Sequence, residues 1–302
     1  MASDQPPKPR ITPFHFGRAK ERGDLIAMVT AYDAPSARLA EAAGIDGILV
    51  GDSAAMAVLG HDSTVQITVD EMLVLTRAVS RSVHKPLVVA DMPFGSFQVS
   101  DEEAVRHAVR LIKEGGAGAV KLEGAGPTLT RVKAIVGVGI PVMGHVGLTP
   151  QSAVALGGYR VQGRRVRDAE RLCEEARALQ GAGCFAVVLE AMPAVVAARI
   201  TGVLEVPTIG IGAGASCDGQ ILVWHDLLGL TTGHVPQFVK RYADLGTAAR
   251  AALETYVTDV RSRTFPEARH TYDMAEGEAE IFGSGLVENR LKAQGSRLKQ
   301  EP

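Results

Sequence analysis

Residues 86–123, PLVVADMPFGSFQVSDEEAVRHAVRLIKEGGAGAVKLE, contain a strand–helix–strand repeat that decides the fold. The apolar run Pro86–Ala90 and the later run Ala119–Leu122 are each typical of a buried strand. Between them, Asp101–Lys113 predicts a helix, because it has helical periodicity and opens with acidic residues that suit a helix N-terminus. Strands that are buried on both faces and separated by a helix indicate a parallel sheet.

The same alternation recurs along the chain, as a short apolar run, a polar or glycine-bearing turn and then a helical stretch. Eight such units favour a closed (β/α)8 TIM barrel over an open Rossmann sheet, and no G-x-G-x-x-G motif opens a helix after the first strand. The predicted strands are Leu25–Thr30, Gly47–Val50, Pro86–Ala90, Ala119–Leu122, Ile140–Gly144, Phe185–Leu189, Val206–Ile211 and Ile221–Trp224. We therefore predict one α/β barrel domain over residues 1–266, with a polar N-terminal arm, and a polar C-terminal tail over residues 267–302.

Composition excludes several classes of protein. Of the 302 residues, 46% are hydrophobic and 22% charged, and the formal net charge of −2 gives no electrostatic reason to expect a nucleic acid or an anionic membrane as partner. No run approaches the ~18 apolar residues of a membrane-spanning helix. The N-terminus is polar and proline-rich, unlike a secretory signal. The odd set Cys173, Cys184 and Cys217 fits neither a disulfide framework nor a zinc site, so we expect inert thiols and a cytoplasmic protein.

Carboxylates dominate the positions that directly follow the predicted strands. The carboxyl ends of barrel strands converge on one face, so we expect Asp52, Asp91 and Glu123, from three adjacent strands, to lie near one another. Acids held together repel, and a hard divalent cation with oxygen ligands relieves that repulsion, which favours a Mg²⁺ site with room for water and substrate. Without a paired-His or Cys cluster, zinc is disfavoured. Helix capping and salt bridges remain alternatives for each acid.

Three further polar residues follow or end predicted strands. Glu190 comes after the apolar run Phe185–Leu189, so its carboxylate is expected in a partly desolvated place that suits proton abstraction; the alternative is a structural ion pair with an arginine. Lys121 lies two residues before Glu123, which places both side chains on the same side of a strand, where the lysine could bind a substrate carboxylate or serve as a structural partner. His145 could donate to a developing oxyanion or be a structural histidine.

A glycine-rich segment, Gly210–Ala215, follows the seventh predicted strand. Such a segment could form an anion-binding nest, as barrels often do at this place. Close backbone packing or a tight turn is at least as good an explanation, so the segment alone predicts no site.

In a fixed order, many short segments resemble those of the ketopantoate hydroxymethyltransferase family, from about Gly23 to His270. The matching segments are TAYD (30–33), VGDS (50–53), GHDST (60–64), ADMPF (90–94), VKLEG (120–124), GHVGLTPQ (144–151), GGYRVQGR (157–164), LE (189–190), GIGAG (210–214) and DGQILV (218–223). The chain departs from the pattern at Ala54-Ala55, where the family often has Leu-Gly, and in the stretch after His270, which extends past the end of shorter members.

The resemblance implies a barrel like those of phosphoenolpyruvate mutase and isocitrate lyase, assembled as a decamer. It also implies transfer of a hydroxymethyl group from 5,10-methylenetetrahydrofolate to 3-methyl-2-oxobutanoate, giving 2-dehydropantoate in pantothenate biosynthesis. Matched residue by residue, Asp52, Asp91 and Glu123 resemble the Mg²⁺ ligands, some of them acting through water. The keto acid would contact Ser53 and Lys121 as well as Asp52 and Asp91, Glu190 would be the base, and His145 would lie in the pocket.

This chemistry is consistent with the residues themselves. A 2-oxo acid can chelate Mg²⁺, which offsets the charge of an enolate, and the enolate then attacks the one-carbon unit. A magnesium-dependent C–C lyase of the isocitrate lyase or phosphoenolpyruvate mutase kind is the main alternative. We find no Lys-Lys-Cys-Gly-His segment typical of that lyase, and Thr149-Pro150-Gln151 fits the transferase. A non-catalytic barrel that only binds a small anion is a further alternative, disfavoured by the complete set of acids.

Overall fold

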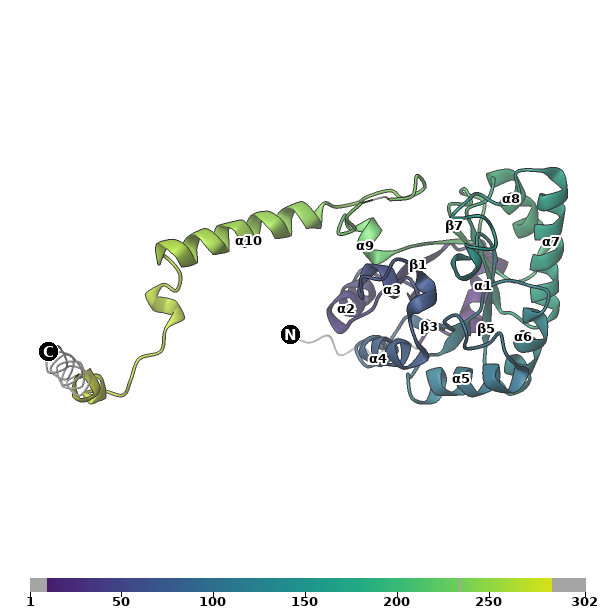
Figure 1. Ribbon diagram of the computed structural model, residues 1–302. Helices are drawn as coiled ribbons and strands as arrows, with labels where there is room; N and C mark the ends of the chain where they lie inside the picture. Colours follow the sequence, from purple (N-terminus) through teal and green to yellow (C-terminus); the bar gives the residue numbers. More distant parts are fainter. Residues whose placement is uncertain (1–9, 234, 284–302) are drawn as a thin grey trace, which may run out of the picture. The chain divides into compact units, whose positions relative to one another are not determined.

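A closed barrel of eight parallel strands forms the body of the protein in a computed structural model, which describes residues 10–233 and 235–283 (Figure 1). Each strand pairs with the next along the chain, and the last pairs with the first, with Ile26 opposite Gly219. The strands are β1 Ile26–Thr30, β2 Gly47–Val50, β3 Leu87–Asp91, β4 Ala119–Lys121, β5 Val142–Gly147, β6 Ala186–Glu190, β7 Thr208–Ile211 and β8 Gly219–Leu222. The predicted (β/α)8 barrel is confirmed.

Helices α1 to α9 surround the barrel, and α2, α4 and α5 each begin at a side chain that accepts a hydrogen bond from the first turn of the helix. Thr68 accepts a hydrogen bond from the Glu71 N–H at the start of α4, and Ser100 does the same for the Glu103 N–H at the start of α5. The helices are α1 Pro13–Arg22, α2 Ala34–Ala42, α3 Ala54–Ala57, α4 Val69–Ser80, α5 Asp101–Lys113, α6 Thr128–Gly137, α7 Val166–Gly181, α8 Ala194–Val203, α9 Trp224–Leu227 and α10 Leu245–Ser262, with short 3₁₀ turns η1 Thr64–Gln66, η2 Pro150–Ser152 and η3 Ala268–His270.

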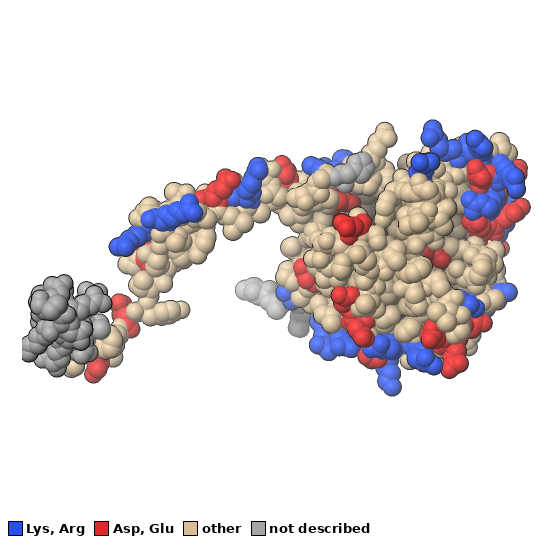
Figure 2. Space-filling model, in the orientation of Figure 1, with Lys and Arg blue, Asp and Glu red and all other residues tan. Residues whose placement is uncertain are grey.

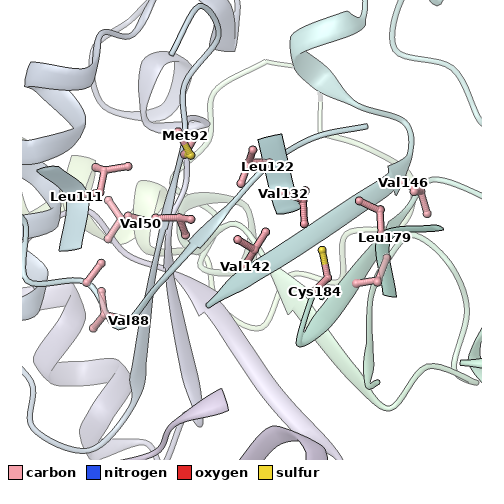
Figure 3. Close-up of a cluster of buried hydrophobic side chains, with 14 of the residues drawn as sticks. Val50, Val88, Met92, Leu111, Leu122, Val132, Val142, Val146, Leu179 and Cys184 are labelled. Carbon is pink, nitrogen blue, oxygen red and sulfur yellow. The ribbon is translucent and has the colours of Figure 1, made fainter. Parts of the chain in front are cut away.

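The strands divide their side chains between two apolar layers, because successive residues of a strand point to opposite faces. One layer holds alternate residues such as Met28, Val89 and Val188 together with Phe16 of α1, and it fills the barrel interior. The other lies between the strands and the helices, and Figure 3 shows part of it, including Val88, Leu111, Val132, Val142 and Leu179. The inner layer matters for function, because the residues that continue it toward the strand carboxyl ends point into the barrel mouth.

Most predicted strands match the observed ones to within two residues at each end; β5 ends three residues later than predicted, and β8 is shifted by two residues as a whole. We predicted Ile221–Trp224, but β8 spans Gly219–Leu222, and Trp224 begins α9. Pairing with β1 determines this register, since a Cβ on Gly219 would lie 2.5 Å from the Ile26 carbonyl oxygen. Three other strands extend further than predicted at their carboxyl ends. Asp91, His145 and Glu190 lie within β3, β5 and β6, whereas the prediction placed them just after those strands.

The chain divides into two compact units, Met1–Leu245 and Gly246–Pro302. The unit that contains the barrel thus ends short of the predicted boundary at residue 266. The reason lies in α10, which has no buried residue in this chain. Residues 284–302 of the predicted tail, and residues 1–9 of the predicted arm, lie outside the described residues.

The charged residues and the thiols are distributed as follows. On the face shown in Figure 2, basic and acidic side chains are interspersed over the barrel unit. Cys173, Cys184 and Cys217 are all buried free thiols. Within residues 10–233 and 235–283, no helix is both long enough and apolar enough to cross a membrane.

Candidate active site

Strand alternation places the predicted acids on the floor of one pocket. Val89 and Ala119 belong to the inner apolar layer, so Asp91 and Lys121, two residues further along β3 and β4, point into the barrel mouth. Glu123 follows Lys121 by the same spacing. The pocket is lined by every residue predicted to belong to the site: Asp52, Ser53, Asp91, Lys121, Glu123, His145 and Glu190.

Asp52, Asp91, Lys121 and Glu123 form a buried group that we call the acid cluster. The Lys121 Nζ donates to Asp91 Oδ1 at 2.7 Å and lies 3.6 Å from Glu123 Oε1. The backbone N–H of Asp52 donates to Asp91 Oδ2 at 3.1 Å. A Cβ on Gly51 would lie 2.8 Å from the Ser53 Oγ, so that side chain would have to shift, whereas Asp91 Oδ2 at 3.5 Å would stay in ordinary contact.

Burial and mutual repulsion determine the charge states in the acid cluster. Burial, followed by the charges of Asp91 and Glu123, raises the pKa of Asp52 well above its usual value. Burial also raises the pKa of Asp91, although Lys121 counteracts it. Burial has the same effect on Glu123, but Lys121 and His145 outweigh it and hold its pKa below the ordinary value. Burial opposes the charge on Lys121, yet the three acids raise its pKa, so it stays an ammonium ion.

His145 connects the acid cluster with Glu190. Its Nδ1 lies 3.5 Å from Glu123 Oε1, and its Nε2 lies 3.2 Å from Glu190 Oε2. Burial and Lys121 lower the pKa of His145, but the two glutamates raise it to about 9, so the ring is an imidazolium at neutral pH. The Glu190 side chain is 15% exposed, against 3% for Glu123, which leaves the Glu190 carboxylate open to the pocket.

The donor set suits a hard divalent cation. The three acids of the cluster offer carboxylate oxygens as ligands. A bound cation would favour the ionised forms of Asp52 and Asp91, whose pKa values are raised in its absence. Among the described residues, however, no three His, Cys, Asp or Glu side chains stand ready as a complete metal-binding group. A cation here would therefore take part of its coordination from water and substrate oxygens.

The glycine-rich segment that follows the seventh strand has a packing role. Gly212 and Gly214 adopt positive φ, and a Cβ on either would lie 2.5 Å from Phe238 or Ala194 respectively. Close packing thus explains the glycine-rich segment, and neither glycine lines the acidic pocket. Of the pair His225-Asp226, Asp226 lines the pocket, whereas His225 stacks on Tyr32 with the ring centroids 5.6 Å apart.

Sequence reasoning missed several side chains that contact the site. Tyr32 Oη lies 2.8 Å from Ser53 Oγ, and the Gln151 side chain donates to Asp52 Oδ2 at 2.9 Å. Both residues lie in segments that resemble the family, but in loops, where no periodicity indicates direction. Tyr159 and Met56 form part of the outer pocket wall, with the tyrosine Oη 4.0 Å from the methionine sulfur.

Comparison with known proteins identifies the family. A family model described as ketopantoate hydroxymethyltransferase matches residues 10–268. The chain belongs to the ketopantoate hydroxymethyltransferase family. It is 58% identical to 3-methyl-2-oxobutanoate hydroxymethyltransferase of Moorella thermoacetica over 87% of this chain and 98% of that one. It is 53% identical to the enzyme of the same name from Carboxydothermus hydrogenoformans, over 88% of this chain and 96% of that one. The family and its class of reaction, both predicted from the sequence, are confirmed.

Solved structures with low sequence identity share the barrel fold of this member of the ketopantoate hydroxymethyltransferase family. A phosphonopyruvate hydrolase matches with a TM-score of 0.57 and 16% identity, covering 95% of this chain and 99% of that one. A 2,3-dimethylmalate lyase, described as a phosphoenolpyruvate mutase/isocitrate lyase superfamily member, matches with a TM-score of 0.57 and 19% identity, covering 95% of this chain and all of the other. The predicted type of barrel is confirmed, and at this identity the likeness concerns the fold alone.

Proposed function

We propose that this chain transfers a hydroxymethyl group from 5,10-methylenetetrahydrofolate to 3-methyl-2-oxobutanoate, giving 2-dehydropantoate in pantothenate biosynthesis, and that it requires Mg²⁺. The observation that carries the proposal is the acid cluster on the pocket floor, joined through His145 to the more open Glu190. Membership in the family supports the reaction. The cation and the residue roles are supported by the geometry of the pocket.

The pocket floor binds and orients the keto acid. Lys121, a buried ammonium ion, is the positive group that faces its carboxylate, and Ser53 Oγ, held by Tyr32, offers a hydrogen bond beside it. Asp52, Asp91 and Glu123 would hold Mg²⁺, in part through water. When bound, the cation supplies positive charge that offsets the negative charge of the enolised keto acid.

Glu190 is the base in this proposal. The His145 ring holds its Oε2, which leaves the other carboxylate oxygen to accept the proton from C3 of the keto acid. The resulting carbon nucleophile attacks the methylene carbon of the folate. This attack breaks the first of the methylene carbon's two C–N bonds. Water then displaces the second nitrogen at the same carbon, so that a C–O bond forms and tetrahydrofolate leaves with one proton from C3 of the keto acid and one from water. Because Lys121 is ionised among acids, it is a poor nucleophile, and a Schiff-base route is disfavoured.

The size of the pocket and the residues of its outer wall support binding of a second, larger substrate. The acidic pocket measures about 730 Å³, far more than a five-carbon keto acid fills. Its outer wall includes Met56, Tyr159 and Phe238, whose apolar and aromatic surfaces suit a flat heterocycle such as the pterin of the folate.

We also propose that the protein is a cytoplasmic homo-oligomer, a decamer by family resemblance. The buried, unpaired cysteines support a reducing compartment. Taken by itself, α10 exposes Leu253, Tyr256, Val257 and Val260, apolar side chains that assembly with further copies would cover.

The experiment is a turnover assay with both substrates, in which product is measured before and after removal of divalent cations. We expect turnover to stop in EDTA and to return on addition of Mg²⁺. Full activity in a rigorously metal-free preparation would contradict the cation requirement. Failure to form product in the presence of Mg²⁺ and both substrates would contradict the assigned reaction.

A further inference from the structure

One buried glutamine contacts two members of the acid cluster. Gln151, at η2, donates from its backbone N–H to Glu123 Oε2 at 3.0 Å. Its side-chain Nε2 donates to Asp52 Oδ2 and to the Met92 carbonyl oxygen, both at 2.9 Å. Since Gln151 is 6% exposed, these bonds are shielded from water. The residue thus connects the loop after β5 with the acids of β2 and β4.

A second glutamine determines which way the Gln151 amide faces. Gln98, in the loop before α5, accepts hydrogen bonds at its Oε1 from the backbone N–H groups of Gly95 at 2.7 Å and Phe97 at 3.3 Å. A backbone N–H can only donate, so Gln98 must present its Nε2 to Gln151, whose Oε1 accepts at 3.3 Å. Gln151 is then left with its own Nε2 toward Asp52. The orientation follows from main-chain donors, without any assumption about either amide.

This orientation matters because of the position of Asp52. Its carboxylate is buried beside two other acids, so an acceptor in place of the Gln151 Nε2 would add to the repulsion already present. With Oδ2 held by the amide, the carboxylate is fixed in one rotation. Oδ1 accepts no hydrogen bond from any described residue, and Asp52 lines the pocket, so this oxygen remains for a ligand.

We propose that Gln98 and Gln151 form a hydrogen-bonded relay that orients the Asp52 carboxylate and so determines how tightly the acid cluster binds a divalent cation. The inference rests on the proposed function, because that proposal supplies the cation. Both glutamines are positioning residues, since they act on the cation only through Asp52 and, for the Gln151 backbone, through Glu123. Their effect should therefore appear in metal affinity before it appears in the chemical step.

The test measures binding of Mn²⁺, a spectroscopic substitute for Mg²⁺, to the full-length protein by electron paramagnetic resonance, with no substrate present. Gln151→Leu removes the donor to Asp52 and should weaken Mn²⁺ binding about 10–100-fold, the usual cost of losing a partner of a metal ligand. Because Gln151 is buried, the melting temperature of each variant is recorded in EDTA as a check on folding.

Gln98→Glu is the more informative variant, because Gln98 is exposed and the fold should tolerate the change. The new carboxylate still accepts from the Gly95 and Phe97 N–H groups but has no hydrogen to donate to Gln151 Oε1. An added negative charge near the site would by itself tighten cation binding. The relay predicts the opposite, namely weaker binding, because the Gln151 amide loses its donor and faces a carboxylate.

Gln66→Glu is the matched control. Gln66 also accepts a backbone N–H at Oε1, from Ser63 at 3.2 Å, and does not line the acidic pocket. We expect this variant to bind Mn²⁺ as the wild type does. Wild-type affinity in both Gln98→Glu and Gln151→Leu, or a lowered melting temperature with unchanged affinity, would overturn the relay. Absence of Mn²⁺ binding to the wild type would instead overturn the proposed cation site, and the relay with it.

Discussion

The surroundings of Asp52 oppose its charge, and a cation bound there would offset this cost. Asp52→Asn keeps the shape but removes the charge, so we expect it to weaken binding of Mg²⁺ and of 3-methyl-2-oxobutanoate together, since both share one coordination sphere. The loss should exceed the ~10–100-fold typical of an outer partner. Without metal, the variant should be at least as stable as the wild type, because a buried repulsion is relieved. Calorimetry and thermal melting measure the two effects.

Asp62→Asn provides the control for Asp52, since Asp62 is also a pocket aspartate but is exposed and lies outside the acid cluster. It should change neither affinity appreciably. Unchanged binding of both ligands by a folded Asp52→Asn protein would show that the metal site has been assigned to the wrong residues.

The individual site residues were predictable to different degrees. Asp91, Lys121 and Glu123 could be found because two-residue alternation in a buried strand specifies the side to which each side chain points. Gln151 and Tyr32 could not, because they lie in loops whose paths depend on packing rather than on a repeating pattern. The amide orientation of Gln151 depends on main-chain donors in the loop before α5, far away in sequence, which no local pattern contains.

At the level of elements, the contact between the ends of β5 and β6 positions Glu190. Gly147 pairs with Glu190, has a φ of +103°, and a Cβ on it would lie 2.2 Å from the Glu190 carbonyl oxygen. Gly147→Ala should therefore move Glu190 and lower the free energy of unfolding by ~1–3 kcal/mol. Turnover should fall further than this loss of stability explains. Chemical denaturation measures the free energy of unfolding, and steady-state kinetics measures turnover of the folded protein.

The control for this element is Gly137→Ala at the end of α6. A Cβ on Gly137 meets nothing within 4 Å, and its φ is not positive. This change should leave turnover unaltered and be neutral or stabilising by up to ~1 kcal/mol. If Gly147→Ala behaved in the same way, the close approach of β5 to β6 would have no part in positioning the base.

The strands themselves were predictable because each is a short apolar run between turn residues, but the ends of β8 were not. Ile221–Trp224 is the apolar run, but β8 begins at Gly219, opposite Ile26 of β1. A Cβ at this position would lie too close to the Ile26 carbonyl oxygen, so the pairing needs a glycine there. Trp224 lies outside the strand, and its backbone N–H donates to Thr30 Oγ1 at 3.0 Å. The pairing of β8 with β1 determines this boundary, which apolar composition alone does not predict.

At the scale of the whole molecule, none of the described residues that line the acidic pocket lies beyond Phe238. Deletion of residues 267–302 should therefore leave turnover near the wild-type value, although assembly or solubility could change. Steady-state kinetics combined with analytical ultracentrifugation separates the two effects. A truncated protein that is folded and assembles as the full chain does, yet has no turnover, would show that the tail takes part in catalysis.

The central claim is that Glu190 removes the C3 proton of a keto acid held over the acid cluster. It is tested most directly by NMR of deuterium entry at C3 of 3-methyl-2-oxobutanoate in heavy water, with Mg²⁺ and tetrahydrofolate present. The wild type should exchange this hydrogen, and EDTA should stop the exchange. Glu190→Gln should still bind Mg²⁺ and the keto acid but exchange ~10²–10⁴-fold more slowly, the usual cost of losing a general base. Exchange at the wild-type rate by folded Glu190→Gln would contradict the claim.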